Sequence, residues 1–180
     1  STISSEMRTG AVSAVVVSTV LMLLYVWFRF KDVRFGASSV AALVHDVLVV
    51  LAFYAAARVS VGNTFIACML TIVGYSINAT IVIFDRIREN LPELKREPIE
   101  SLVDRCITDT LTRSIYSSLT TFITIFVLFV MGVSSIRDFA APLMVGVLVG
   151  AYSSVCITGA LWYVMKKKFA GKGQLSLIHI

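Results

Sequence analysis

The chain has 180 residues, of which 57% are hydrophobic and 15% are charged, and its mean hydropathy is +0.86. Soluble domains carry about a quarter charged residues, so this composition excludes a disordered tail and argues against a water-soluble domain. A formal charge of +5 would suit binding to nucleic acid, but in a membrane protein the basic residues usually indicate which loops lie on the cytoplasmic side. We therefore expect a membrane partner and no nucleic-acid partner.

Apolar runs predict an all-α membrane protein with five spans, each near the roughly 20 residues that a bilayer requires. The expected spans are residues 11–28, 35–57, 64–84, 115–131 and 139–165. Residues 1–10 look like the end of a preceding segment, so we expect a fragment. Residues 171–180 form a tail, and 175–180 resemble a translated sequencing adapter.

Orientation follows from the cations, because short cytoplasmic loops are enriched in Lys and Arg. Thirteen of the 16 cations follow the first, third and fifth spans, and only Arg8, Arg58 and Arg137 fall on the other side. The sequence therefore places the start of the chain outside the cell and its end in the cytoplasm. The expected location is the bacterial cytoplasmic membrane, crossed several times.

The segment 85–113 is the only long polar stretch between the predicted spans. Its apolar residues recur at helical spacing behind Pro98, a favoured first helical residue. This pattern predicts an amphipathic helix on the cytoplasmic membrane surface. It is either a connector that orients the next span or a docking site for a cytoplasmic partner.

His45 and Asp46 lie about ten residues into the second span, some 15 Å deep at 1.5 Å per residue. An aspartate at such a depth costs about 2.5–3.5 kcal/mol on insertion scales. The functional interpretation is a proton or cation site that faces the bundle interior. The alternative is an aspartate whose hydrogen bonds only join helices.

Other polar residues in the spans are candidate partners of Asp46. Asn78 lies at a similar depth in the third span, and we expect it to face Asp46. Five hydroxyls share one face of the fourth span, and they form either a packing surface or a polar wall toward Asp46. They are Ser114, Ser117, Ser118, Thr121 and Thr124.

A charged group follows the third span at its cytoplasmic lip, where Asp85, Arg86 and Arg88 occur. Such residues ordinarily fix the orientation of the span and form ion pairs along the helix. Arg86 could instead hold Asp46 in its ionised form if a conformational change brought the two together. Gly146 and Gly150 form a G-x-x-x-G that we interpret as packing only.

Catalytic and metal-binding patterns are absent from the sequence. Hydrolase, metalloprotease, P-loop and dinucleotide-binding motifs do not occur, so no enzyme activity is expected. Cys68, Cys106 and Cys156 have neither disulfide-framework nor zinc-site spacing, so we expect no metal and no cofactor.

Five motifs, in this order and at this spacing, resemble the SecF family of protein-export membrane subunits. They are Trp27-Phe-Arg-Phe30, Ala41-Ala-Leu-Val-His-Asp46, Gly74-Tyr-Ser-Ile-Asn-Ala-Thr-Ile-Val-Ile-Phe-Asp-Arg-Ile-Arg-Glu-Asn90, Arg113-Ser-Ile-Tyr-Ser-Ser-Leu-Thr-Thr121 and Gly146-Val-Leu-Val-Gly-Ala-Tyr-Ser-Ser154. The resemblance implies a six-helix half of the RND permease superfamily, without its first helix and extracytoplasmic domain. The five spans would then be helices two to six, and residues 1–10 the end of that domain.

The resemblance also implies a function, namely ion-gradient-coupled assistance to protein export, with protons or alternatively sodium as the coupling ion. The implied partners are SecD, the SecYEG translocon, the translocating preprotein and membrane lipid. Asp46, Asn78 and Arg86 are the implied ion-coupling residues, and Asn78 stands where SecD has an aspartate. Several relatives carry an acidic residue where this chain has Ala79, which argues against a mechanism that needs a carboxylate there.

Two other functions stay open from the sequence. One is an RND-type permease that moves lipids or small molecules, and the other is a passive scaffold subunit of the translocon. His45, Asp85, Arg88, Ser117, Thr121 and Thr124 are supporting candidates for the ion-coupling site.

Overall fold

The chain forms a bundle of long helices in a computed structural model that describes residues 2–30, 33–59 and 61–170. The elements are α1 (Thr2–Phe30), α2 (Val33–Ala57), α3 (Asn63–Asn90), a 3₁₀ turn η1 (Leu91–Lys95), α4 (Ile99–Met131), α5 (Ser134–Ser153), a π-helical turn η2 (Ser154–Thr158) and α6 (Gly159–Ala170). No strand occurs in these ranges, which confirms the all-α class. The predicted tail over 171–180 lies outside the described residues.

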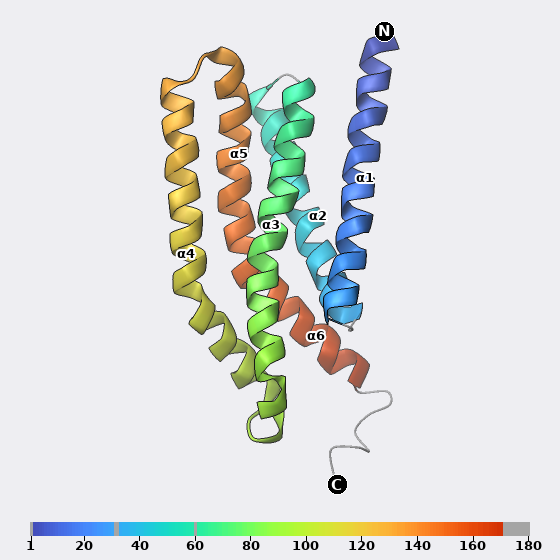
Figure 1. Ribbon diagram of the computed structural model, residues 1–180, viewed down its shortest axis with the longest axis vertical. Helices are drawn as coiled ribbons and strands as arrows, with labels where there is room; N and C mark the ends of the chain where they lie inside the picture. The colour runs from blue at the N-terminus through green and yellow to red at the C-terminus, as the bar shows by residue number, and fades with distance from the viewer. Residues whose placement is uncertain (1, 31–32, 60, 171–180) are drawn as a thin grey trace.

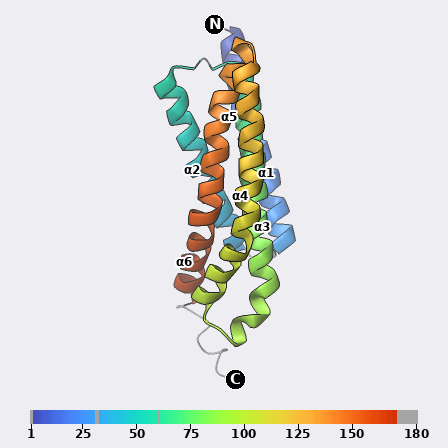
Figure 2. The same cartoon turned by 90° about the vertical axis from the view of Figure 1, so that its left-hand side faces the viewer.

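Among the described residues, four helical rods are long and apolar enough to cross a membrane: Arg34–Ala57, Thr64–Leu94, Ile99–Met131 and Ser134–Lys168. The fifth rod, α1, lies beside α2 and α3. Figures 1 and 2 show the rods running up and down the bundle, with α5 between α2, α3 and α4. Many large apolar side chains face outward, especially on α4, as expected where lipid is the solvent.

The helix ends that follow the first, third and fifth predicted spans share one end of the bundle, at the bottom of Figure 1. We call this the basic end, defined by Arg29, Arg34, Arg86 and Lys166, and the other end, where Arg58 and Arg137 occur, the opposite end. Arg58 ends α2 there with a φ of 53°, in the left-handed region that often terminates helices.

The structure corrects the prediction that residues 85–113 contain a helix lying on the membrane surface. α3 continues to Asn90, and α4 runs unbroken from Ile99 to Met131, with Pro98 just before its first residue. The amphipathic spacing is correct, since Leu102, Val103 and Cys106 are buried. Their apolar face packs on α2, α3 and α6, however, because those helices offer a protein surface in place of lipid.

Two apolar clusters occupy the two ends of the bundle. The cluster at the basic end contains Phe35, Phe84 and Trp162 together with residues of α4. The cluster at the opposite end includes Val50, Met69, Ile72 and Val147 and other residues of α2 to α5. A middle layer between them carries buried polar side chains.

Candidate functional site

Asp46 lies in the middle of α2 and is 0% exposed. Ser76 Oγ of α3 donates to Asp46 Oδ2 at 2.5 Å, and Ser153 Oγ of α5 donates to the same oxygen at 2.7 Å. Two other helices therefore bond to one carboxylate oxygen. Both distances lie within the range of O–H···O hydrogen bonds, the first at its short limit.

His45 completes the contacts of this carboxylate. Its Nδ1 lies 3.0 Å from Asp46 Oδ1, and its side chain is 39% exposed. Neighbouring residues on a helix point about 100° apart, yet the imidazole bends back to the aspartate. His45 thus links the buried carboxylate to the surface of the bundle.

Small residues on α5 allow α3 to approach closely enough for these bonds. A Cβ at Gly150 would lie 3.5 Å from Ser76 Cα and 3.8 Å from Asp46 Oδ2, and a Cβ at Gly146 would meet Ile72 at 2.5 Å. The interpretation of the G-x-x-x-G as packing only therefore fits Gly146 but not Gly150. Gly150 also borders the carboxylate, so it shapes the site.

The backbone changes from α to π geometry at the site. Ser153 is the last residue of α5 and directly precedes η2, and the Thr158 hydroxyl donates to the Ser153 carbonyl at 3.1 Å. Single π turns occur frequently at functional sites and mark bends in helices. Ser153 is thus held at a bend between α5 and α6.

The prediction that Asn78 faces Asp46 is wrong. Asn78 is exposed, and Ser76 takes the position beside the carboxylate. Depth along the helix was predicted correctly, but two residues correspond to a rotation of about 200°. Asn78 therefore points away from the face of α3 that carries Ser76.

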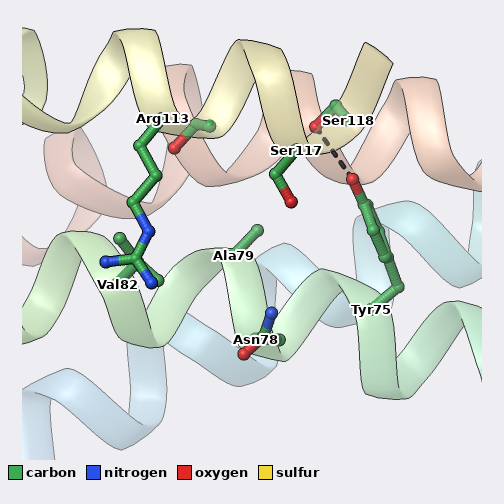
Figure 3. Close-up of a pocket in the computed structure, with 8 residues that line it drawn as sticks. Tyr75, Asn78, Ala79, Val82, Arg113, Ser117 and Ser118 are labelled. Atoms are coloured by element: carbon green, nitrogen blue, oxygen red, sulfur yellow. Dashed lines mark hydrogen bonds between the residues drawn. The ribbon is translucent and has the colours of Figure 1, made fainter. Parts of the chain in front are cut away.

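A second polar site lies between α3 and α4, where Asn78 lines a small pocket of about 60 Å³. Figure 3 shows Arg113 and Ser117 of α4 across from α3, and Tyr75, whose hydroxyl donates to Ser118 Oγ at 2.9 Å. The pocket is lined by Tyr75, Asn78, Ala79, Val82, Arg113, Ser114, Ser117 and Ser118.

The hydroxyl face of α4 does not lead to Asp46 in this structure. Thr121 donates to the Ser117 carbonyl and Thr124 donates to the Thr120 carbonyl, so both satisfy their own helix. Ser114 and Ser118 are buried on the side that faces α3. The packing alternative fits these two residues better than a polar wall toward the carboxylate.

The charged lip also lies apart from the carboxylate. Arg86 Nη2 is 2.8 Å from Asp109 Oδ2 of α4, and its Nη1 is 3.7 Å from Glu89 Oε2. Arg86 lies ten residues beyond Ser76 on α3, about 15 Å along the axis. Asp85 is partly buried and Arg88 is exposed, and Arg86 is the member of this group that joins α3 to α4 through Asp109.

Sequence reasoning missed Ser76 and Ser153, the two closest partners of Asp46. Both occur within the motifs quoted above, but serine is common in packed membrane helices and carries no distinct signal. Over the described ranges, no cluster of three or more His, Cys, Asp or Glu side chains could hold a metal ion.

The fold and the site define a multi-helix membrane protein with an ionisable group buried between its helices, an arrangement typical of ion pathways. Over residues 1–168 the chain matches the family described as "Protein export membrane protein SecD/SecF, C-terminal", and it belongs to that family.

Named relatives support the assignment to this family. The chain is 46% identical to the protein translocase subunit SecDF of Thermus thermophilus over 166 residues, which cover 92% of the chain and 22% of that protein. It is 40% identical to the protein translocase subunit SecF of Petrotoga mobilis over 163 residues, which cover 91% of the chain and 54% of that subunit. The chain thus spans about half of this SecF relative.

The fold is shared with solved structures of SecDF. A crystal structure of SecDF in its super-membrane-facing form matches with a TM-score of 0.86 and 45% identity, covering 93% of this chain and 23% of that one. A crystal structure of SecDF from Thermus thermophilus matches with a TM-score of 0.85 and 46% identity. These matches confirm the fold that the resemblance to SecF implied.

Proposed function

We propose that this chain is the membrane part of a SecF-type subunit that promotes protein export together with SecD beside the SecYEG translocon. In this role it uses an ion gradient, with the proton as the coupling ion and sodium as the alternative. Its relatives are named as protein translocase subunits, which supports the export function. The observation that carries the coupling is the fully buried Asp46 with hydroxyl donors from two other helices.

The geometry suggests how ionisation could change helix packing. Ser76 and Ser153 tie α3 and α5 to the same oxygen of α2. Hydrogen bonds to charged groups contribute about 1.5–3 kcal/mol each, against about 0.5–1.5 kcal/mol for neutral pairs. Protonation of Asp46 therefore weakens the junction of three helices by a few kcal/mol and lets them shift.

The gradient supplies an energy of the same size. One charge that crosses 100 mV yields about 2.3 kcal/mol, so one proton can drive a change that loosens two charge-assisted bonds. In the proposed cycle Asp46 takes up the ion from outside, loses its charge, and releases the ion at the basic end. We assign the basic end to the cytoplasm of a bacterium because Lys and Arg gather there.

In the test, this chain replaces the matching residues of a bacterial SecF, and the product is expressed in a strain whose own SecF can be depleted. We call the product the hybrid SecF. Asp46→Asn in the hybrid keeps the shape of the side chain but removes its titration. We expect normal assembly with SecD and loss of the gradient-dependent part of secretion. Full export by the Asp46→Asn variant would remove Asp46 from the mechanism.

Two other functions give different results in the same strain. A permease for lipids or small molecules would leave secretion unrestored even with the unchanged hybrid. A passive scaffold would restore secretion with apolar substitutions at Asp46, Ser76 and Ser153. The complete burial of a carboxylate with its own set of donors argues against the scaffold, which needs no such group.

A further inference from the structure

Three helices repeat the same order of side chains between the carboxylate and the basic end. On α2 the order is Asp46, Ser39 and Phe35; on α3 it is Ser76, Thr80 and Phe84; on α5, η2 and α6 it is Ser153, Thr158 and Trp162. Each step is one or two helical turns, so the members of each set lie on one face. All nine side chains are at most 3% exposed.

The nine residues form three layers across the bundle. The carboxylate layer is joined by the bonds from Ser76 and Ser153 to Asp46. The hydroxyl layer consists of Ser39, Thr80 and Thr158, of which Ser39 donates to the Phe35 carbonyl at 2.8 Å and Thr158 to the Ser153 carbonyl at 3.1 Å. The aromatic layer consists of Phe35, Phe84 and Trp162.

The aromatic layer is a contiguous barrier. The rings of Phe35 and Trp162 are stacked with centroids 4.9 Å apart, and Phe84 meets Phe35 edge-on at 4.7 Å. Residues of α4, among them Leu102 and Cys106, pack around them. Beyond the layer, Lys166 Nζ lies 4.7 Å from the Trp162 ring centroid, so charged residues begin directly outside it.

The opposite side of Asp46 is different. One turn beyond Asp46, Val50 is 0% exposed and belongs to the apolar cluster of the opposite end. Ile72, one turn before Ser76, belongs to the same cluster. The buried hydroxyls of Ser39 and Thr80 thus lie on the side of the carboxylate that faces the basic end, whereas on the other side α2 carries the buried hydroxyl of Tyr54, two turns beyond Asp46. A hydroxyl both donates and accepts and its hydrogen rotates, so this side offers groups that can pass a proton toward the basic end.

One ring of the aromatic layer lies beyond the π turn. Trp162 lies on α6, which leaves the line of α5 at the π turn η2 (Figure 1). Its indole Nε1 is buried.

We infer that Phe35, Phe84 and Trp162 form a gate between the water at the basic end and the hydroxyl layer below Asp46, and that α6 opens it by bending at η2. The gate rests on the proposed function, because it controls when the ion on Asp46 can leave. The three rings act by excluding water and do not bind the ion.

The test measures water access to the hydroxyl layer directly. Ser39→Cys is introduced into the hybrid SecF, assembled with SecD, in a background without the three native cysteines. Inside-out membrane vesicles are treated with a membrane-impermeant thiosulfonate reagent. We expect slow labelling of the cysteine at position 39 while the gate is intact. Phe35→Ala, which removes both ring contacts, should accelerate it about tenfold or more.

Trp162→Ala and Trp162→Phe provide a graded pair. Alanine at position 162 should accelerate labelling, whereas phenylalanine keeps a ring against Phe35 and should restore slow labelling. The matched control is Val50→Cys on the same helix, equally buried but on the other side of Asp46. Its labelling should stay slow in every variant, because opening the gate admits water only as far as the carboxylate.

Three results would overturn the gate. They are fast labelling at position 39 with the aromatic residues intact, no acceleration by either alanine variant, and equal acceleration at positions 39 and 50. Equal acceleration would show general loosening of the bundle. Labelling requires no ion transport, so failure of the gate is distinct from failure of the proposed function, which Asp46→Asn tests through secretion.

Discussion

The hydrogen bond from Ser153 to Asp46 makes the sharpest prediction, because the neighbouring residue supplies a matched control. Ser153 and Ser154 are both 0% exposed. Ser153 Oγ donates to Asp46 Oδ2 at 2.7 Å, whereas Ser154 Oγ donates to the Ala151 carbonyl at 3.0 Å. Ser153→Ala and Ser154→Ala thus remove the same atom from equally buried positions, but only the first deprives the carboxylate of a donor.

The expected sizes of the two effects follow from these partners. Loss of a bond to a charged group costs about 1.5–3 kcal/mol, so Ser153→Ala raises the free energy of the ionised carboxylate by that amount. If release of the ion limits export, the gradient-dependent rate falls about 10- to 100-fold. The Ala151 carbonyl keeps its helical position without Ser154, so Ser154→Ala should change the rate by less than about threefold.

The assay is the rate of secretion by the hybrid SecF, measured with and without a membrane potential. Both variants should reach the membrane in equal amounts with SecD, which immunoblotting of purified complexes checks. Ser76→Ala serves as a second test, because Ser76 donates to the same oxygen at 2.5 Å. Equal losses from Ser153→Ala and Ser154→Ala would refute the reasoning, since burial alone would then explain the effect.

Two further predictions concern packing and charge. Gly146→Ala should destabilise the purified complex by about 1–3 kcal/mol, measured by thermal denaturation, because the added Cβ would lie 2.5 Å from Ile72 and overpack the contact. Gly150→Ala should be tolerated, because the added Cβ would lie 3.5 Å from its nearest neighbour. Equal stabilities would contradict the close approach of α5 to α3. Arg86→Gln and Asp109→Asn should reduce gradient-driven export equally, and the double variant no further, because the two side chains form one ion pair. Additive losses would show that each residue acts alone.

Composition and periodicity determined the class of this protein. Runs of about 20 apolar residues can satisfy their backbone groups in lipid only as helices, so the rods and their alternation followed from the sequence. Asp46 could also be identified from the sequence, because a carboxylate at that depth in the bilayer is costly unless other groups stabilise it. The order of the motifs then pointed to SecF, and the chain belongs to the SecD/SecF C-terminal family.

The partners of Asp46 were decided by the tertiary structure. Depth along a helix follows from counting residues, but the direction of a side chain around the axis relative to another helix depends on how the helices rotate as they pack. Asn78 and Ser76 lie at similar depths and point to opposite sides of α3. The rotation is set by contacts such as Gly146 against Ile72, which involve residues more than 70 positions apart. The aromatic layer is likewise visible only when α6 is placed beside α2 and α3, because no local pattern joins Phe35, Phe84 and Trp162.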